Sequence, residues 1–550
     1  MSMNKLYYGD NLEVLRAEIK DESIDLIYLD PPFNSKANYN ILFKSPETGD
    51  SAHSQIEAFD DTWHWGNEAQ KEYDEIVRSS HTELAELIQA LRHFLKENDM
   101  MAYLVMMASR LVELHRVLKS TGSLYLHCDP TASHYLKLVL DAIFGFGNFR
   151  NEITWKRQSA HSDAKHRFPN ISDNILFYAK SDSAQFHPVY IEHDPEYVKK
   201  FYRFNDNDGR GLYRLADMAS PNPRPNMMYE WKGYPFPAKG WRYEKSTMLK
   251  LDNEGRIYYP KRPDGTPDTK KRLCLKRYLS EQEGSIVTNI WSDLNVLSAA
   301  ATESLGYPTQ KPVALLERII SASSQEMDTI LDPFCGCGTA VHAAEKLNRK
   351  WIGIDITCLS ISLIERRIRE AFPGVQFEVH GTPKDLESAR DLANRDKYQF
   401  QWWAISLIGA QPYQGKKKGA DSGIDGLIFF KDDHTENYKK IIVSVKGGEH
   451  INVAMIRDLM GTIEREKAAI GIFITLTEPT APMKQEAASA PLYKSPLFPN
   501  GIYPTIQILT IEGLLNKTQK PEYPNLYMTD LAFKRTEKET KKQDSQTELF

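Results

Sequence analysis

A glycine-rich turn and an acidic residue one strand later form the strongest chemical signal in the sequence. The turn is Asp332-Pro-Phe-Cys-Gly-Cys-Gly-Thr339, and the acid ends the segment Gly353-Ile-Asp355. Glycines let a backbone approach a ligand closely, and a carboxylate at the next strand end suits the vicinal hydroxyls of a ribose. The GxGxxG spacing of dinucleotide sites is absent. The two segments indicate a nucleoside-containing cofactor without a pyrophosphate.

A second signal is Asp30-Pro31-Pro32-Phe33, which follows a run of apolar residues. Carboxylates at the carboxyl edge of parallel strands point into the ligand crevice. The two prolines fix the backbone, which gives the Pro31 carbonyl a defined direction. The segment predicts a slot with two hydrogen-bond acceptors for an exocyclic amino group and an aromatic ring over the face of a planar substrate.

The elements that must position these residues alternate between strands and helices. Near-continuous apolar runs predict strands at residues 24–29, 122–127, 329–331 and 351–354, and helical spacing covers 11–20, 84–119, 132–144, 313–322, 338–347 and 359–372. This alternation is typical of a parallel sheet that helices cover on both faces. We therefore expect a doubly wound α/β domain formed by residues 1–150 together with 300–375.

The intervening residues 151–299 differ in composition. The chain as a whole has a net charge of −5, but residues 151–280 carry 24 Lys/Arg against 16 Asp/Glu, together with 20 aromatic residues. Gly, Pro, Asn and Asp punctuate short aromatic runs, which predicts an irregular, β-rich insertion. A basic, aromatic segment inside an acidic protein indicates nucleic-acid binding. The best candidates for this contact are Arg210, Arg214, Arg224, Arg242, Lys270, Lys271, Arg272 and Arg277.

The ordered set of motifs resembles the permuted β class of S-adenosylmethionine-dependent amino DNA methyltransferases. In that family a DPPF-type motif comes first, a target-recognition region follows, and an FxGxG cofactor motif comes last. The match extends to Tyr8-Gly-Asp10, to Phe144-Gly-Phe-Gly-Asn148 with Asn151-Glu-Ile-Thr-Trp155, and to Tyr307-Pro-Thr-Gln-Lys-Pro312. Trp231-Lys-Gly and Gly240-Trp-Arg242 resemble modification subunits of type III systems. The resemblance covers residues 5–375 and implies a circularly permuted methyltransferase sheet.

The resemblance also implies residue roles. Asp30 and the Pro31 carbonyl would accept hydrogen bonds from the target amine, with Pro32 completing the turn and Phe33 stacking on the flipped base. The cofactor would be S-adenosylmethionine, held by Asp10, Thr309, Lys311, Asp332, Phe334, Gly336, Gly338 and Asp355. An aspartate at position 30 favours adenine N6 as the target. Cytosine N4, RNA or protein amides, and a non-catalytic DNA-binding defence component are the alternatives.

The C-terminal part resembles an Mrr-like restriction nuclease module of the PD-(D/E)xK superfamily. Gly419-Ala-Asp-Ser-Gly-Ile-Asp-Gly426 and Val443-Ser-Val-Lys446 carry this resemblance. It implies an α/β nuclease-like domain over residues 399–515, with Asp425 as a Mg²⁺ ligand and Lys446 beside it. Ser444 stands where the family has an acid or Gln, so an active nuclease and a degenerate DNA-binding or structural module both stay open. Residues 376–398 are expected to be a linker, and residues 516–550 a tail with a disordered end.

Composition excludes several other classes of protein. No apolar run approaches the roughly 18 residues of a membrane helix, and the first ten residues lack the pattern of a signal peptide. Five cysteines in 550 residues do not form a disulfide framework. We expect a cytoplasmic prokaryotic protein that acts on double-stranded DNA without a membrane, either as a homodimer or with restriction or defence subunits.

Overall fold

The computed structural model describes most of the chain, and in strands β3 (Asn38–Leu42) and β4 (Gln55–Asp60) it describes the backbone alone. The segments outside the described residues are 1–2, 33–37, 43–54, 61–62, 158–167, 299–300, 302, 306, 308–309, 414–422, 433–437, 498–500, 525–535 and 542–550. The chain forms two compact units, residues 1–187 with 289–550 and residues 188–288.

A nine-stranded sheet organises the first unit, in the order β14-β6-β7-β5-β2-β15-β16-β1-β17. Its strands are β1 (Asn4–Tyr8), β2 (Ile24–Leu29), β5 (Leu118–Cys128), β6 (Phe149–Lys156), β7 (Ser172–Ala179), β14 (Ile290–Trp291), β15 (Thr329–Asp332), β16 (Lys350–Asp355) and β17 (Phe377–His380). The strands from β5 to β17 in this order are parallel, whereas β7 pairs antiparallel with both β5 and β6. All six residues of β2 are buried, as expected of a central strand covered on both faces.

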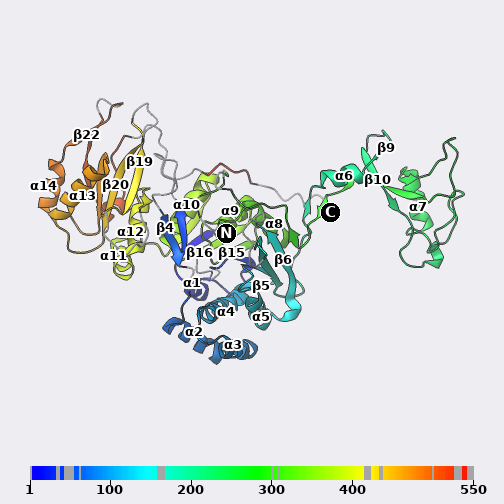
Figure 1. Cartoon of the computed structure of the whole chain (residues 1–550), viewed down its shortest axis with the longest axis horizontal. Helices are drawn as coiled ribbons and strands as arrows, with labels where there is room; N and C mark the ends of the chain where they lie inside the picture. Colours follow the sequence, from blue (N-terminus) through cyan, green and yellow to red (C-terminus); the bar gives the residue numbers. More distant parts are fainter. Residues whose placement is uncertain are drawn as a thin grey trace. The chain divides into compact units, whose positions relative to one another are not determined.

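Helices lie on both sides of this sheet, as Figure 1 shows. On one side are α1 (Asn11–Glu18), α2 (Asn67–Arg78), α3 (Thr82–Leu95), α4 (Asp99–Val117) and α5 (Ser133–Phe144), and on the other are α8 (Val313–Ser323), α9 (Thr339–Lys346) and α10 (Cys358–Ala371). The main core joins β2 and β5 to α4, in which Tyr103, Leu104 and Val105 have no exposed surface. The doubly wound α/β fold predicted from the sequence is thereby confirmed.

Three predicted boundaries differ from the structure. Residues 376–398, predicted as a linker, contain β17 and helix α11 (Leu386–Arg395), because Phe377 and its neighbours extend the sheet beside β1. Residues 151–187, predicted to belong to the insertion, complete the same sheet through β6 and β7. In the predicted tail, residues 536–541 return to helix α10: the Glu539 amide donates to the Ala371 carbonyl at 2.9 Å.

The second unit, residues 188–288, contains a four-stranded antiparallel sheet in the order β11-β12-β10-β9. Its elements are β8 (Tyr190–Ile191), α6 (Pro195–Phe201), β9 (Phe204–Asn205), β10 (Leu212–Asp217), α7 (Lys245–Asn253), β11 (Ile257–Tyr258), β12 (Cys274–Tyr278) and β13 (Ser285–Ile286). Met218, Tyr234, Trp241 and Met248 form its buried core together with Ile257 and Leu273. Aromatic residues of the basic insertion therefore serve partly as core.

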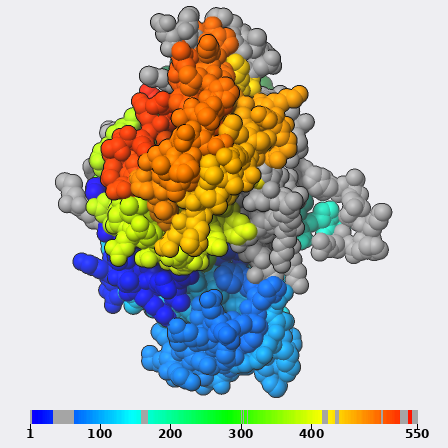
Figure 2. All heavy atoms as spheres, turned by 90° about the vertical axis from the view of Figure 1, so that its left-hand side faces the viewer, coloured from blue at the N-terminus to red at the C-terminus, as the bar shows by residue number. Residues whose placement is uncertain are grey.

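The C-terminal part folds around a five-stranded sheet in the order β18-β19-β20-β21-β24. Its elements are α12 (Lys397–Ser406), β18 (Gln411–Pro412), β19 (Gly426–Phe430), β20 (Lys439–Lys446), α13 (Val453–Glu466), β21 (Ile470–Thr475), α14 (Ala481–Ser489), β22 (Leu492–Lys494), β23 (Ile502–Pro504), β24 (Ile506–Thr510) and α15 (Ile511–Leu515). Figure 2 shows these residues, in yellow to orange-red, as one continuous body. Across the described part of the chain, no helix combines the length and apolar character that a bilayer crossing requires.

Candidate active site

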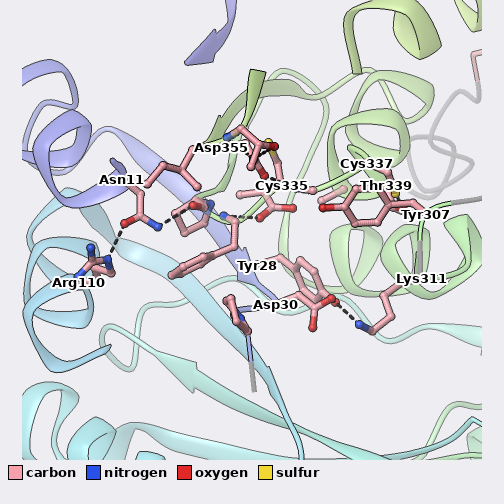
Figure 3. Close-up of a pocket in the computed structure, with 18 of the residues that line it drawn as sticks. Asn11, Tyr28, Asp30, Arg110, Tyr307, Lys311, Cys335, Cys337, Thr339 and Asp355 are labelled. Carbon is pink, nitrogen blue, oxygen red and sulfur yellow. Dashed lines mark hydrogen bonds and ion pairs between the residues drawn. The ribbon is translucent and has the colours of Figure 1, made fainter. Parts of the chain in front are cut away.

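A pocket opens at the carboxyl ends of four neighbouring strands, β2, β15, β16 and β1 (Figure 3). We call it the strand-end pocket. Its walls are Gly9, Asp10, Asn11, Tyr28, Asp30, Pro32, Trp63, Arg110, Tyr307, Lys311, Leu316, Asp332, Pro333, Phe334, Cys335, Gly336, Cys337, Thr339, Ala340, Asp355, Ile356 and Thr357. The two signals that the sequence presents far apart thus line one cavity, because β2 and β15 are adjacent in the sheet. Phe33 and Thr309 lie outside the described residues.

The glycine-rich turn forms one wall of the strand-end pocket. Gly336 has a φ of +48°, and a Cβ atom there would lie 3.3 Å from the ring of Tyr307, so the turn needs glycine for both reasons. Gly338 has a φ of +75°, and a Cβ atom there would lie 2.7 Å from Ile364. Gly338 is not among the residues that line the pocket. Glycine at this position is required by the turn and by the packing on α10, and its approach to the cofactor stays a prediction.

Asp355, the last residue of β16, is hydrogen-bonded to the glycine-rich turn. Its Oδ2 accepts a hydrogen bond from the Gly336 amide at 2.9 Å, and its Oδ1 accepts from the Thr357 amide at 2.9 Å and hydroxyl at 2.8 Å. Thr357 also caps α10, and its hydroxyl contacts that of Ser360. Burial raises the pKa of the Asp355 carboxyl. This carboxylate is therefore held rigidly at the pocket wall.

Asp332 lies deepest of the pocket carboxylates, with 4% of its surface exposed. One of its oxygens accepts a hydrogen bond from the Phe334 amide at 3.0 Å. Burial raises the pKa of the Asp332 carboxyl well above its usual range, and the nearby carboxylates of Asp30 and Asp355 raise it further. The pocket thus favours a positively charged ligand group beside Asp332.

Asp30 pairs with Lys311 in the wall of the strand-end pocket (Figure 3). The Lys311 ammonium donates to Asp30 Oδ2, and both side chains are largely buried. Within the described residues, the other carboxylate oxygen of Asp30 has no hydrogen-bond partner. The sequence predicted Lys311 as a cofactor ligand, and the structure also makes it the cationic neighbour of the predicted catalytic aspartate.

Asp10 lies at the pocket edge, but its carboxylate is occupied within the protein. Oδ1 caps helix α1, and Oδ2 accepts from Arg110 at 2.9 Å. Arg110 also donates to Asn11 at 2.6 Å, and Asn11 donates to the Pro333 carbonyl at 2.9 Å. This network joins α1 and α4 to the residue after Asp332. Sequence reasoning missed Asn11 and Arg110, because their contacts bring together residues about 100 to 320 positions apart.

Tyr28, which lines the pocket, is the first member of a buried chain of hydrogen-bonded side chains. The Tyr28 hydroxyl lies 3.0 Å from His127 Nδ1, and His127 Nε2 lies 3.2 Å from Asp173 Oδ2. His127 and Asp173 have 0% and 3% of their surfaces exposed. The charged form of Asp173 is favoured by His127 and by Arg157, which together overcome burial and lower the pKa of Asp173. No local sequence pattern links Asp173 to His127, because the two residues lie on the paired strands β5 and β7.

Comparison with known proteins identifies the family. A model of the DNA methylase family matches residues 24–365, more than half of the chain. The chain belongs to the DNA methylase family. It is a DNA methyltransferase of the restriction-modification type. The permuted order of its motifs within that family stays a prediction.

Two relatives and one solved structure illustrate the similarity. Type II methyltransferase M.EcaI of Enterobacter cloacae is 29% identical over 367 residues, which cover 66% of this chain and 69% of that protein. The Mod subunit of the type III restriction-modification enzyme StyLTI of Salmonella typhimurium is 26% identical and covers 64% of this chain, which spans 51% of that subunit. The crystal structure of TTHA0409 from Thermus thermophilus, complexed with S-adenosyl-L-methionine, has 16% identity and a TM-score of 0.32, and covers 68% of this chain and 99% of that one.

All eight predicted DNA-contacting residues of the methylase lie in the second unit. Arg210 pairs with Asp208 at 2.6 Å, and Lys271 lies 3.5 Å from Asp268. Arg224 and Arg242 donate to backbone carbonyls, and Lys270 and Arg272 are exposed. Arg214 and Arg277 stand opposite one another on β10 and β12.

Two of the three predicted nuclease residues of the methylase, Asp425 and Ser444, contact each other beside the inner strands β19 and β20 of the C-terminal sheet. Asp425 Oδ2 accepts from the Val445 amide at 2.7 Å and lies 3.5 Å from the Ser444 hydroxyl. Ser444 is buried, and Lys446 ends β20. No group of three or more His, Cys, Asp or Glu residues that could hold a metal occurs in the part of the chain that the structure describes. A model named NACHT-associated inactive Restriction Endonuclease 1 matches residues 400–516, so this is a restriction-endonuclease-like domain. The predicted Mg²⁺ ion has no support from these observations.

Proposed function

We propose that this methylase transfers a methyl group from S-adenosylmethionine to the N6 amino group of adenine within a specific DNA sequence. The observation that carries the proposal is the strand-end pocket, in which the Asp30 carboxylate shares one cavity with the Gly336 turn and Asp355. An acceptor for an amine therefore lies in the same cavity as the features expected of a nucleoside site. The aspartate at position 30 favours adenine over cytosine N4.

The pocket residues fit the proposed cofactor. S-adenosylmethionine supplies a methyl group bonded to a positively charged sulfur, and its amino group is a second cation. The carboxylates of Asp332 and Asp30 offer negative charge to both, and Asp355 offers oxygens to the ribose hydroxyls. The Ile356 side chain, 60% exposed at the pocket wall, offers an apolar surface to a purine ring.

Asp30 would prepare the target amine for reaction. The lone pair of adenine N6 is delocalised into the ring, so the amine is a poor nucleophile. A hydrogen bond from N6 to the Asp30 oxygen that Lys311 does not contact would make the amine more nucleophilic and orient it, and orientation alone contributes much of such accelerations. Lys311 would keep the other oxygen in place. The target base must leave the duplex to reach this pocket.

The test is modification-sensitive sequencing of DNA from cells that express the full chain. N6-methyladenine in one sequence motif is expected, together with loss of the mark in Asp30→Ala. Asp21→Ala, which removes an exposed carboxylate just before the same strand, should keep it. Detection of N4-methylcytosine instead would show that cytosine is the target. If the protein binds the cofactor but leaves the DNA unmethylated, the result would favour a non-catalytic component or an RNA or protein substrate.

The basic second unit and the restriction-endonuclease-like domain favour DNA over RNA or protein as the substrate. Because the relatives include a type III Mod subunit, we further propose that the methylase works in a restriction-modification or phage-defence system. Co-purification of the tagged full chain from its host would identify any restriction subunit or a second copy of this chain.

A further inference from the structure

The central strands of the second unit place two arginines directly opposite each other. In the antiparallel pairing of β10 and β12, Arg214 is the register partner of Arg277. Register partners project from the same face of a sheet with Cβ atoms about 5 Å apart. The exposed Leu212, two residues before Arg214 on β10, belongs to that face as well. Two guanidinium groups therefore share one small area of surface.

Among the described residues, this pair has no carboxylate partner of the kind that neighbouring basic residues have. On the opposite face of the same strands, Lys276 pairs with Asp206 at 2.5 Å. Arg256 contacts Glu281 at 2.6 Å. Arg210 pairs with Asp208 and lies over the Tyr278 ring. Within the described residues, the side chains of Arg214 and Arg277 make no hydrogen bond or ion pair, and the Arg214 Nε is buried without a partner.

Such an arrangement is unfavourable unless an anion completes it. Like charges directly opposite one another destabilise an antiparallel pair, and a buried N–H group without an acceptor costs further free energy. Guanidinium groups bind phosphate in planar, bidentate geometry, so a phosphate between the two arginines would offset their repulsion and accept hydrogen bonds from their terminal nitrogens. We propose that Arg214 and Arg277 together form a clamp for a backbone phosphate of the DNA duplex. The inference rests on the proposed function, because it takes DNA as the substrate.

The clamp predicts a specific change in salt dependence. Each phosphate contact contributes about 0.9 to the slope of log K against log salt concentration. Binding of the purified full chain to a mixed-sequence duplex, measured by fluorescence anisotropy over a salt series, should therefore show a slope shallower by about 0.9 when Arg214→Ala and Arg277→Ala are combined, and by part of that amount in each single variant. Arg214→Lys and Arg277→Lys, which keep the charge, should keep the slope. Thermal unfolding of each variant confirms that it is folded.

Arg256→Ala is the matched control, because it also removes one arginine from this unit but one that carboxylates already neutralise. An unchanged slope is expected for it. If Arg214→Ala and Arg277→Ala kept the wild-type slope, the clamp would be refuted although the chain binds and methylates DNA. A change confined to one base pair of the recognition sequence would also refute it and place the arginines on a base edge. Failure of the wild-type chain to bind any duplex would overturn the proposed function and the clamp with it.

Discussion

The strand-end pocket concentrates negative charge at the scale of single residues. Asp30, Asp332 and Asp355 lie at the ends of three adjacent strands, and burial raises the pKa values of the latter two. Carboxylates this close cannot all stay ionised without cations. Lys311 supplies one cation to Asp30. We therefore expect the pocket to bind most tightly a ligand that places a positive charge beside Asp332.

Cofactor binding should consequently release a proton from Asp332. The raised pKa favours the protonated carboxyl in the empty pocket and a bound cation favours the ionised form, so affinity should rise as the pH rises. Calorimetric titration with S-adenosylmethionine in two buffers of different ionisation enthalpy measures this proton. Asp332→Asn should abolish the release and weaken binding by roughly tenfold to a hundredfold. Asp355→Asn should weaken binding but keep the release, and equal release from Asp332→Asn would contradict the assignment.

Replacing Lys311 separates two roles for that residue. If Lys311 mainly positions Asp30, Lys311→Met should lower kcat by roughly tenfold to a hundredfold while the dissociation constant of the cofactor stays nearly unchanged. Lys311→Arg should restore much of the rate, because it keeps the charge beside the carboxylate. Single-turnover methylation and cofactor titration measure the two quantities. A large loss of cofactor affinity with an unchanged methylation step would instead support the role predicted from the sequence.

At the scale of elements, helix α4 holds a histidine in a largely buried position. Burial lowers the pKa of His115 to about 4, and its ring packs edge-on against Phe144 on α5. The folded state keeps the imidazole neutral, whereas the unfolded chain takes up a proton near pH 6.5. The free energy of unfolding should therefore fall as the pH drops from 6.5 to about 4, by up to about 1.4 kcal/mol per pH unit from this group.

Denaturant unfolding across this pH window tests the contribution of His115. His115→Gln should show a shallower loss of stability than the wild type, even if it is less stable at neutral pH. His134→Gln, which replaces an exposed histidine on α5, should keep the wild-type slope. Equal slopes in all three proteins would show that His115 titrates alike in the folded and unfolded chains.

The elements show which features periodicity can predict. The apolar run at residues 24–29 is observed as β2, and the predicted helix at residues 338–347 is observed as α9. The helix predicted over residues 84–119 is instead two helices, because Lys96 has a φ of +64° and Asn98 caps α4. The contact between Asp173 and His127 could not be predicted from the sequence, because the two residues lie on different strands. Pairing between β5 and β7 leaves no local sequence pattern.

The whole molecule joins a methyltransferase to a restriction-endonuclease-like domain. The two parts touch where α12 packs on α10, and Gln399 accepts from the Cys358 amide at 2.9 Å. Cys358 begins the helix that follows Asp355 and the pocket wall. Residues 536–541 return to the same part of the fold, where Lys541 pairs with the buried Glu345 at 2.6 Å. The C-terminal residues thus contact the methyltransferase directly.

The side chains at the predicted nuclease site lead us to expect that the C-terminal domain does not cleave DNA. A two-carboxylate site would bind Mg²⁺ and generate the attacking water, but Ser444 supplies a neutral hydroxyl, and the Val445 amide holds an oxygen of Asp425. Supercoiled plasmid incubated with the full chain and Mg²⁺ should therefore stay intact, with or without the joint replacement Asp425→Ala and Lys446→Ala. Methylation should persist in that double variant, because the strand-end pocket lies outside the domain. Mg²⁺-dependent nicking that the double variant lacks would restore the nuclease assignment and make Ser444 compatible with metal binding.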